Sequence, residues 1–193
     1  HINSKNTMGV WVKMEWINMS EIKQEMRTRI DKDVDSLLKQ SGYSEDTDSY
    51  VDIIDFVNHY GFDVVNADLE EKDDGFIAIT ANLKLIAVNS KRSLEWKRFV
   101  IAHEFAHSIL HYKQGDSAYL HRENVKGKNE SENAADYFAA ALLMPVRSFS
   151  SEYQKLKSKN LSENAICMQL SSIFKVPLES VSRRILELNL QSV

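Results

Sequence analysis

The stretch Phe99–His107 reads Phe-Val-Ile-Ala-His-Glu-Phe-Ala-His, an H-E-x-x-H pattern inside an apolar run. In an α-helix, which turns once every 3.6 residues, His103 and His107 lie about 40° apart on one face. Two imidazoles one turn apart can bind one zinc ion from the same side. Glu104 lies about 100° round from His103, beside the metal position rather than on it. The alternative is that these three residues are ordinary members of a buried core helix.

Apolar residues flank this stretch on almost every side of the helix, which is typical of a buried helix. We expect the helix to span residues 93–112. Buried histidines and a buried glutamate cost free energy unless they have partners. The burial of this helix therefore favours the metal interpretation.

Upstream of the helix, three short apolar runs follow the pattern of β-strands. They cover residues 62–65, 75–80 and 84–89. Only residues 81–83 separate the last two runs, and a link this short predicts an antiparallel hairpin. The acidic segment 68–74 is expected to be a solvated loop.

Helical periodicity dominates the rest of the chain, and Pro145 ends an alanine-rich helix. The predicted helices cover residues 20–40, 48–59, 130–144, 147–158, 161–174 and 177–188. Together with the strands, they predict an α+β fold that is mostly helical, with a small three-stranded sheet. We expect one domain over residues 15–145 and a C-terminal helical subdomain over residues 146–193.

The composition of the 193-residue chain excludes several classes of protein. Its net charge of −4 gives no general attraction to nucleic acid. The single cysteine, Cys167, rules out a disulfide framework and favours a cytoplasmic setting. The apolar surroundings of Cys167 predict a buried thiol rather than a nucleophile. No apolar run approaches the roughly 20 residues of a membrane helix, and no signal-peptide pattern opens the sequence.

A catalytic zinc site usually has three protein ligands and one position for water, so a third ligand is required. One class of zinc peptidases places a third histidine six residues after the second, with a glycine between them. Lys113 holds that position here and Leu110 replaces the glycine, so the sequence disfavours this class. His111 falls two residues short and is expected to be a helix-end histidine.

The other class takes a glutamate from a second helix. Glu132 and Asp136 lie one turn apart on one face of the predicted helix 130–144. Glu132 is the candidate third ligand, and Asp136 can accept a hydrogen bond from the free ring nitrogen of a ligand histidine. Two alternatives stay open: Glu130 as the ligand, or Glu132 in a capping box with Asn129.

Three stretches together resemble the ImmA/IrrE family of zinc metallopeptidases. They are Val88–Asn89, Lys97–His107 and Glu132–Pro145. The most specific part is the E-x-x-A-D pattern that is followed by F-A-x-x-L-L-M-P. The resemblance covers about residues 48–145 well and the C-terminal helices loosely. Val100 departs from the family, which often has Thr at this position.

The resemblance implies a zincin-like metallopeptidase domain of the gluzincin type, in which zinc is bound by His103, His107 and Glu132. It also implies a bacterial or phage-encoded, intracellular endopeptidase that cuts a partner repressor of helix-turn-helix type. The cut derepresses genes of a mobile element, a prophage or a stress response. Manganese and iron stay open as alternatives to zinc.

In the expected mechanism, zinc lowers the pKa of its bound water and Glu104 accepts the proton. The polar segment 113–129 after the central helix is expected to be a loop. Tyr119 and His121 in this segment are candidate donors to the oxyanion. Val88 and Asn89 are candidates to pair with an extended substrate as an added strand.

The alternative function is a regulator that binds its partner, or DNA, without cutting it. Residues 165–188 resemble a helix-turn-helix or a repressor-docking unit. Residues 147–193 contain seven Lys and Arg against four Glu, a local charge of +3. Arg183 and Arg184 are candidate DNA contacts, although they can equally be solvated helix residues. Because the whole chain is acidic, direct binding of nucleic acid is not expected.

Overall fold

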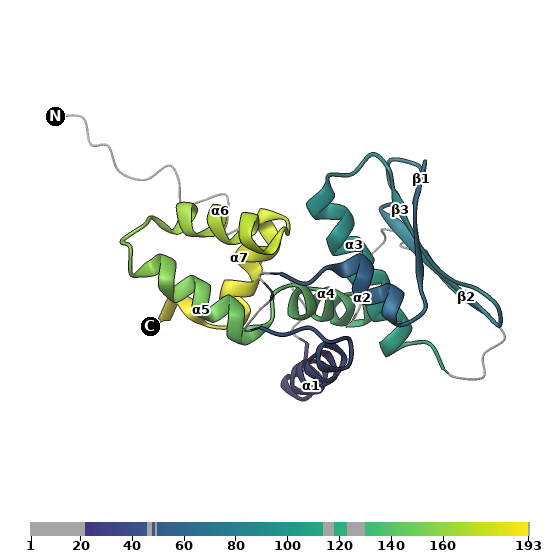
Figure 1. Cartoon of the computed structure of the whole chain (residues 1–193), viewed down its shortest axis with the longest axis horizontal. Helices are drawn as coiled ribbons and strands as arrows, with labels where there is room; N and C mark the ends of the chain where they lie inside the picture. The colour runs from purple at the N-terminus through teal and green to yellow at the C-terminus, as the bar shows by residue number, and fades with distance from the viewer. Residues whose placement is uncertain (1–21, 46–47, 49, 114–117, 123–129, 193) are drawn as a thin grey trace.

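The computed structural model describes residues 22–45, 48, 50–113, 118–122 and 130–192. In this part of the chain, seven α-helices accompany one four-stranded mixed sheet (Figure 1). The sheet lies at one end of the molecule and helices α5 to α7 lie at the other, with α3 and α4 between them. The predicted α+β class, mostly helical, is confirmed.

The sheet has the strand order β1-β3-β2-β4. The strands are β1 (Asp63–Ala67), β2 (Gly75–Thr80), β3 (Lys84–Asn89) and β4 (Ala118–Arg122). Strands β2 and β3 form the predicted antiparallel hairpin. Strand β1 pairs with β3 in parallel, and β4 pairs with β2 antiparallel.

The fourth strand is the main difference from the predicted sheet. Strand β4 lies inside the segment 113–129, which was predicted to be a loop. Its five residues pair with β2, which is more distant in the sequence than a hairpin partner, so no local turn signal marks the pairing. Residues 114–117 and 123–129 of that segment lie outside the described residues.

Helix boundaries follow the capping side chains. The helices are α1 (Gln24–Gln40), α2 (Ile53–His59), α3 (Leu94–Leu110), α4 (Glu130–Leu143), α5 (Val146–Lys157), α6 (Glu163–Phe174) and α7 (Leu178–Glu187), followed by a 3-10 turn at Leu190–Ser192. Helix α2 begins later than predicted because Asp52 accepts hydrogen bonds from the backbone of Ile54 and Asp55. Ser93 caps α3 by accepting from Trp96 N at 3.2 Å.

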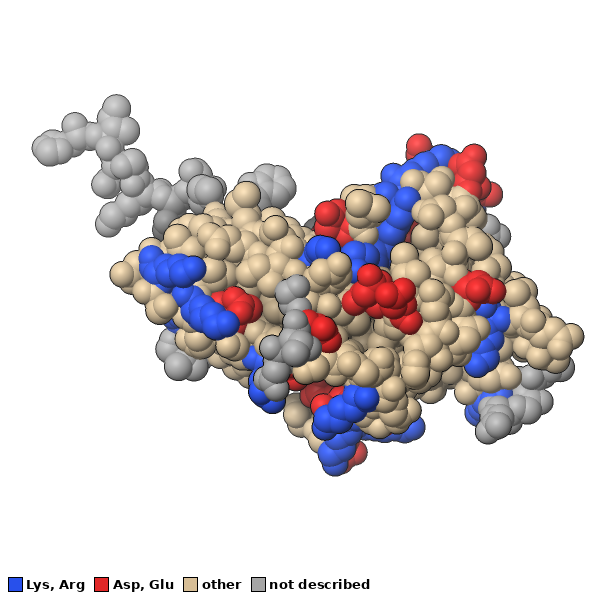
Figure 2. Space-filling view, in the orientation of Figure 1, with Lys and Arg blue, Asp and Glu red and all other residues tan. Residues whose placement is uncertain are grey.

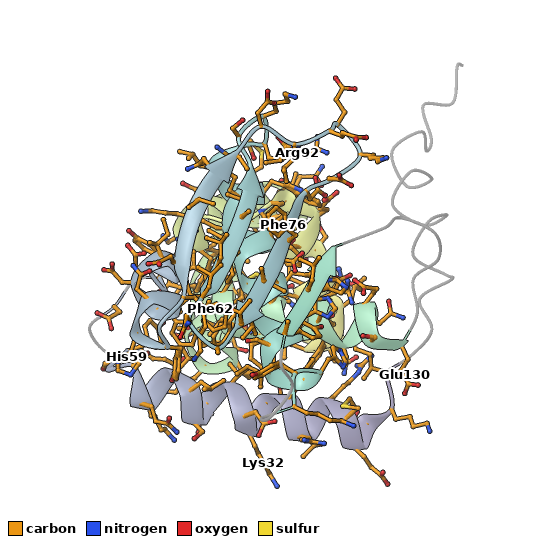
Figure 3. The ribbon with its side chains drawn as sticks, turned by 90° about the vertical axis from the view of Figure 1, so that its right-hand side faces the viewer. Lys32, His59, Phe62, Phe76, Arg92 and Glu130 are labelled. Carbon is orange, nitrogen blue, oxygen red and sulfur yellow. The ribbon has the colours of Figure 1, made fainter. Side chains whose placement is uncertain are left out.

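Helix α3 packs between the sheet and α4, as Figure 3 shows from the side of the sheet. Gly75 allows the close approach of β2, because a Cβ there would lie 2.6 Å from Val100 Cγ1 and 2.7 Å from Ala87 O. Phe105 of α3 is fully buried, and its ring meets the rings of Phe56 and Phe62 edge-on. These contacts make α3 the centre of the hydrophobic core.

The C-terminal helices are attached to this core by hydrogen bonds from two arginines, of which that of Arg184 is buried. Arg98 of α3 donates to Lys175 O at 2.9 Å, and Arg184 of α7 donates to Met144 O at 3.2 Å. Phe149 of α5 packs on Phe174 of α6 with ring centroids 5.3 Å apart. The boundary at residue 145 stays a prediction. None of the helices in the described ranges has the length and apolar character that a membrane crossing requires.

Candidate metal centre

Helix α3 carries the H-E-x-x-H pattern in its last two turns, at the centre of the core. His103 is 5% exposed, and Glu104 and His107 are fully buried. Three buried polar side chains on one helix need partners. Helix α4 supplies partners for the two histidines, and the pairing of α3 with α4 is the most extensive helix contact in the described chain.

Three donor atoms from these helices converge on one point. His103 Nε2 lies 3.0 Å from His107 Nε2 and 3.2 Å from Glu132 Oε2, and His107 Nε2 lies 3.5 Å from that oxygen. Donors on a tetrahedral zinc ion with bonds of about 2.1 Å lie about 3.4 Å apart. The measured distances bracket this value, so the donor set fits a zinc ion.

Asp136 fixes the ring of His103. His103 Nδ1 donates to Asp136 Oδ1 at 3.0 Å, which leaves Nε2 unprotonated in a neutral ring and directed at the point of convergence. Asp136 lies one turn after Glu132 on α4, as the E-x-x-x-D spacing predicts. Its other oxygen accepts from Arg183 NH1 at 3.0 Å.

The charges around the cluster favour a cation. Burial alone lowers the pKa of His103, but hydrogen bonds to Asp136 and Glu132 outweigh it and raise the pKa to about 10. Hydrogen bonds from the histidines hold the pKa of Glu132 far below its usual range. Burial lowers the pKa of His107, so the two rings together favour one positive charge. A metal cation can take the place of this proton where the donor atoms meet.

Strand β4 brings His121 and Tyr119 to the same site. They occupy alternate positions opposite Ile77 and Ile79, whose side chains are buried, so both face the helices. The ring of His121 stacks on His107 with centroids 3.6 Å apart. Its Nδ1 lies 3.3 Å from Glu104 Oε2, and its Nε2 lies 3.3 Å from Glu132 Oε1.

The two residues of β4 differ in charge. Burial opposes the charged form of His121, but hydrogen bonds to Glu104 and Glu132 raise its pKa to about 9. Burial, followed by the charges of Glu104 and Glu132, raises the pKa of Tyr119 to about 12. At neutral pH, therefore, Tyr119 is a neutral hydroxyl donor and His121 carries a proton in the metal-free cluster.

Only one of the two carboxylate oxygens of Glu104 has a hydrogen-bond partner among the described residues. Its Oε2 contacts His121, whereas Oε1 is buried and has no hydrogen-bond partner among the described residues. A buried oxygen without a partner is costly, and such atoms mark a place for a ligand or a water molecule. Glu104 lies outside the group of donors that converge, as the helical geometry predicts.

Other candidates lie away from the cluster. Glu130 is exposed at the start of α4, where Figure 3 labels it, and is not a member of the converging group. His111 Nε2 lies 2.7 Å from Ser131 Oγ, so this ring nitrogen is hydrogen-bonded to Ser131 and does not join the metal donors. Asn129, the proposed capping partner, lies outside the described residues.

The strand order corrects the prediction on Val88 and Asn89. Both belong to β3, which is paired with β1 on one side and β2 on the other, so its backbone cannot accept a further strand. Asn89 is fully buried, and its amide donates to Glu70 O and Asp73 O. Its role is to fix the loop between β1 and β2.

Arg183 and Arg184 are the residues whose position the sequence analysis missed. Arg183 is 7% exposed and Arg184 is fully buried, so neither is a solvated helix residue. Arginine is rarely buried without partners, and one sequence offers no signal for those partners. Spacing alone therefore could not find the contact of Arg183 with Asp136.

Residues 57–186 match the family described as IrrE N-terminal-like domain, a peptidase family. The match includes the donor cluster, β4, Asp136 and helix α7. The chain belongs to this family. The resemblance to the ImmA/IrrE family is thus confirmed. The cluster of His103, His107 and Glu132 is consistent with the H-E-x-x-H zinc site of an IrrE-like domain.

The IrrE-like fold has a relative among solved structures. A Mycobacterium tuberculosis transcriptional regulator matches with 18% sequence identity and a TM-score of 0.53. The match covers 83% of this chain and 51% of the other, so the IrrE-like chain spans about half of that regulator. At this identity the likeness shows the fold alone. No curated protein matches the chain.

Proposed function

We propose that the protein is a zinc-dependent endopeptidase that cleaves a partner regulatory protein. The observation that carries the proposal is the geometry around Glu104. A buried carboxylate lies beside three converging metal donors, and one of its oxygens is unpaired among the described residues. A purely structural zinc site has no need of such a carboxylate.

His103, His107 and Glu132 would hold the metal, and Asp136 would keep the ring of His103 in place. A zinc ion held there would supply a water of lowered pKa and polarise the peptide carbonyl. Glu104 would take a proton from this water at Oε1, which has no partner among the described residues, as the water oxygen bonds to the carbonyl carbon. It would pass the proton to the amine nitrogen as the peptide C–N bond breaks.

His121 and Tyr119 complete the polar wall of the site. His121 holds Glu104 through Nδ1, which orients the carboxylate that moves the proton. Tyr119 stays protonated because of its raised pKa, so its hydroxyl can donate to the oxyanion of the substrate carbonyl. These roles extend the donor cluster to a full peptidase site.

Strand β4 is the candidate surface for the substrate backbone. Among the described strands it pairs only with β2, and its Leu120 is 70% exposed on the face away from the site. An extended peptide added to this edge would run past His121 and Tyr119. We therefore propose β4, in place of β3, as the strand to which an extended substrate would be added.

The proposed substrate is a repressor of helix-turn-helix type, whose removal derepresses mobile-element, prophage or stress genes. Membership of the IrrE N-terminal-like family supports a role in gene control. A cytoplasmic setting fits this substrate.

Direct binding of DNA has less support in the structure. Arg183 and Arg184 are buried and engaged with carboxylates. On the face shown in Figure 2, Lys and Arg side chains lie among Asp and Glu side chains rather than in one basic surface. The phosphate backbone of DNA binds best to a continuous basic surface.

Replacement of Glu104 by Gln tests the proposed function. The variant should keep its zinc, because Glu104 is not a donor, and should lose cleavage of a co-encoded repressor by about a hundredfold or more. Cleavage is followed by gel electrophoresis and mass spectrometry of the products. Glu95→Gln, an exposed glutamate on the same helix, is the matched control and should cleave normally.

Undiminished cleavage by Glu104→Gln would rule out the mechanism. If the repressor binds the wild-type protein, stays uncleaved and releases its DNA, the result would instead support a regulator that acts without cutting.

A further inference from the structure

A chain of hydrogen bonds links helix α7 to the back of the metal cluster. Arg183 NH1 donates to Asp136 Oδ2 at 3.0 Å, and Asp136 Oδ1 accepts from His103 Nδ1 at 3.0 Å. On its other side, Arg183 Nε donates to Glu187 Oε1 at 2.9 Å. The chain runs from Glu187 through Arg183 and Asp136 to His103, a metal donor.

Each link of this chain is shielded from water. The side chains of Arg183 and Glu187 are 9% and 5% exposed, and that of Asp136 is 17% exposed. Charge-assisted hydrogen bonds are strong where water is excluded, and removal of one partner leaves the other uncompensated. Burial opposes the charge on Asp136, but His103 and Arg183 lower its pKa, so the carboxylate is held ionised.

We propose that Arg183 is a positioning residue of the metal site. By holding Oδ2 of Asp136, it fixes the carboxylate that sets the orientation and tautomer of the His103 ring. The site therefore reaches its full metal affinity only when α7 is docked against α4. This inference rests on the proposed metal site and adds a dependence on the C-terminal helices.

A cavity beside this chain of hydrogen bonds shows why packing alone does not hold Asp136. The cavity has a volume of about 160 Å³ and is lined by residues that include Trp96, Phe99, Ala140, Asp136 and Arg183. Open space on this side leaves the carboxylate free to turn unless a hydrogen bond restrains it. Arg183 provides that restraint.

Arg184 offers a matched control on the same helix. It is fully buried, its Nε donates to Met144 O at 3.2 Å and its NH1 to Glu187 Oε2 at 3.4 Å. Its hydrogen bonds therefore run to the residue that follows α4 and to its own helix rather than to Asp136. Loss of Arg184 should destabilise the docking of α7 at least as much as loss of Arg183, without touching the carboxylate.

The test compares Arg183→Met with Arg184→Met in the full chain. Zinc affinity is measured by competition with a chelating dye, and the geometry of the site by the visible absorption of bound Co²⁺. Partners of metal-binding histidines typically contribute 10- to 100-fold to affinity, and Arg183 acts one bond further out, so we expect a loss of about tenfold. Arg184→Met should bind zinc as the wild type does, and only Arg183→Met should change the Co²⁺ bands.

Asp136→Asn shows whether Arg183 acts through Asp136. In that background, Arg183→Met should lower zinc affinity by little more, because the carboxylate that Arg183 holds is already lost. Arg183→Lys, which keeps a donor and the charge, should recover part of the affinity. If Arg183→Met does not fold, Arg183→Gln, which keeps a polar group of smaller size, gives the same comparison.

Wild-type zinc affinity in folded Arg183→Met or Arg183→Gln would overturn the inference. An equal loss in Arg184→Met would overturn it too, since docking in general would then be the cause. Failure of the wild-type protein to bind zinc or Co²⁺ would instead defeat the proposed metal site, so the two failures are distinguishable.

Discussion

Polar side chains are buried in both halves of the molecule, but their partners differ. On α3 and α4, His103, His107 and Glu132 direct lone-pair atoms to one point, 3.0 to 3.5 Å apart. On α7, Arg183 and Arg184 are held by carboxylates and a carbonyl. In the first cluster, acceptor atoms converge and need a proton or a metal ion between them, whereas in the second, carboxylates face guanidinium groups.

This difference separates two reasons for burying charge. Converging acceptor atoms are stabilised by a proton or a cation, so such a group marks a candidate site. Ion pairs between arginines and carboxylates order the contact between helices, and only Nη2 of Arg183 and of Arg184 are buried there without a hydrogen-bond partner among the described residues. The distinction would fail if variants of the two clusters changed zinc affinity equally.

The strongest test of the comparison is the loss of a donor from the first cluster. His103→Ala removes one of three donors and leaves Oδ1 of Asp136 without its partner. Zinc affinity should therefore fall by more than about a hundredfold, a larger loss than that caused by removing a residue that only supports a donor. Zinc content after dialysis measures the effect. His111→Ala, one turn beyond His107 and occupied by Ser131, should keep its zinc; equal loss in both variants would contradict the assignment.

Zinc itself should stabilise the folded chain. At a free concentration a hundredfold above Kd, binding to the native state alone adds about 2.7 kcal/mol to the free energy of unfolding. Urea denaturation with zinc and with a chelator measures this gain. The gain should vanish in His103→Ala, and a similar gain in that variant would show that zinc acts elsewhere.

The smallest expected effect concerns Cys167, which lies on α6 among the C-terminal helices, away from the metal cluster. Burial raises its pKa above the ordinary value of 9.0. A raised folded pKa favours the thiol, so the small stability contribution is present below pH 9 and is lost as pH rises through the folded pKa. Cys167→Ala should flatten this alkaline decline in urea denaturation between pH 8 and about 10.

The thiol offers a direct check on the same shift. At pH 8 the native protein should react with a thiol reagent more slowly than the urea-unfolded chain, because less thiolate is present. Equal rates in the two states would argue against the raised pKa.

Local patterns explain what the sequence could predict. The period of a single helix accounts for the spacing of His103 and His107 on α3, and for that of Glu132 and Asp136 on α4. The apolar run around the H-E-x-x-H pattern is local too. The β2–β3 hairpin is equally local, since three residues join its strands. These features follow from residues close together in the chain, and the structure has them where the sequence places them.

Non-local pairings explain what it could not. Strand β4 is recognised only by its pairing with β2, and β3 becomes an internal strand only because β1 joins it. Arg183 faces inward although α7 reads as a helix with charges for solvent, because Asp136 on α4 offers a partner 47 residues earlier. No single stretch of sequence contains either fact.

The position of β4 has a consequence for how the site assembles. Its pairing with β2 joins residues 75–80 to residues 118–122, so the chain that forms α3 must close a loop between them before the strand can dock. Short strands with few pairs belong to the parts of a fold that open first in hydrogen exchange. His121 should thus arrive last during folding and leave first in native fluctuations, while the donors on α3 and α4 stay together. Loading with metal and readiness for catalysis are then separate steps on the folding pathway.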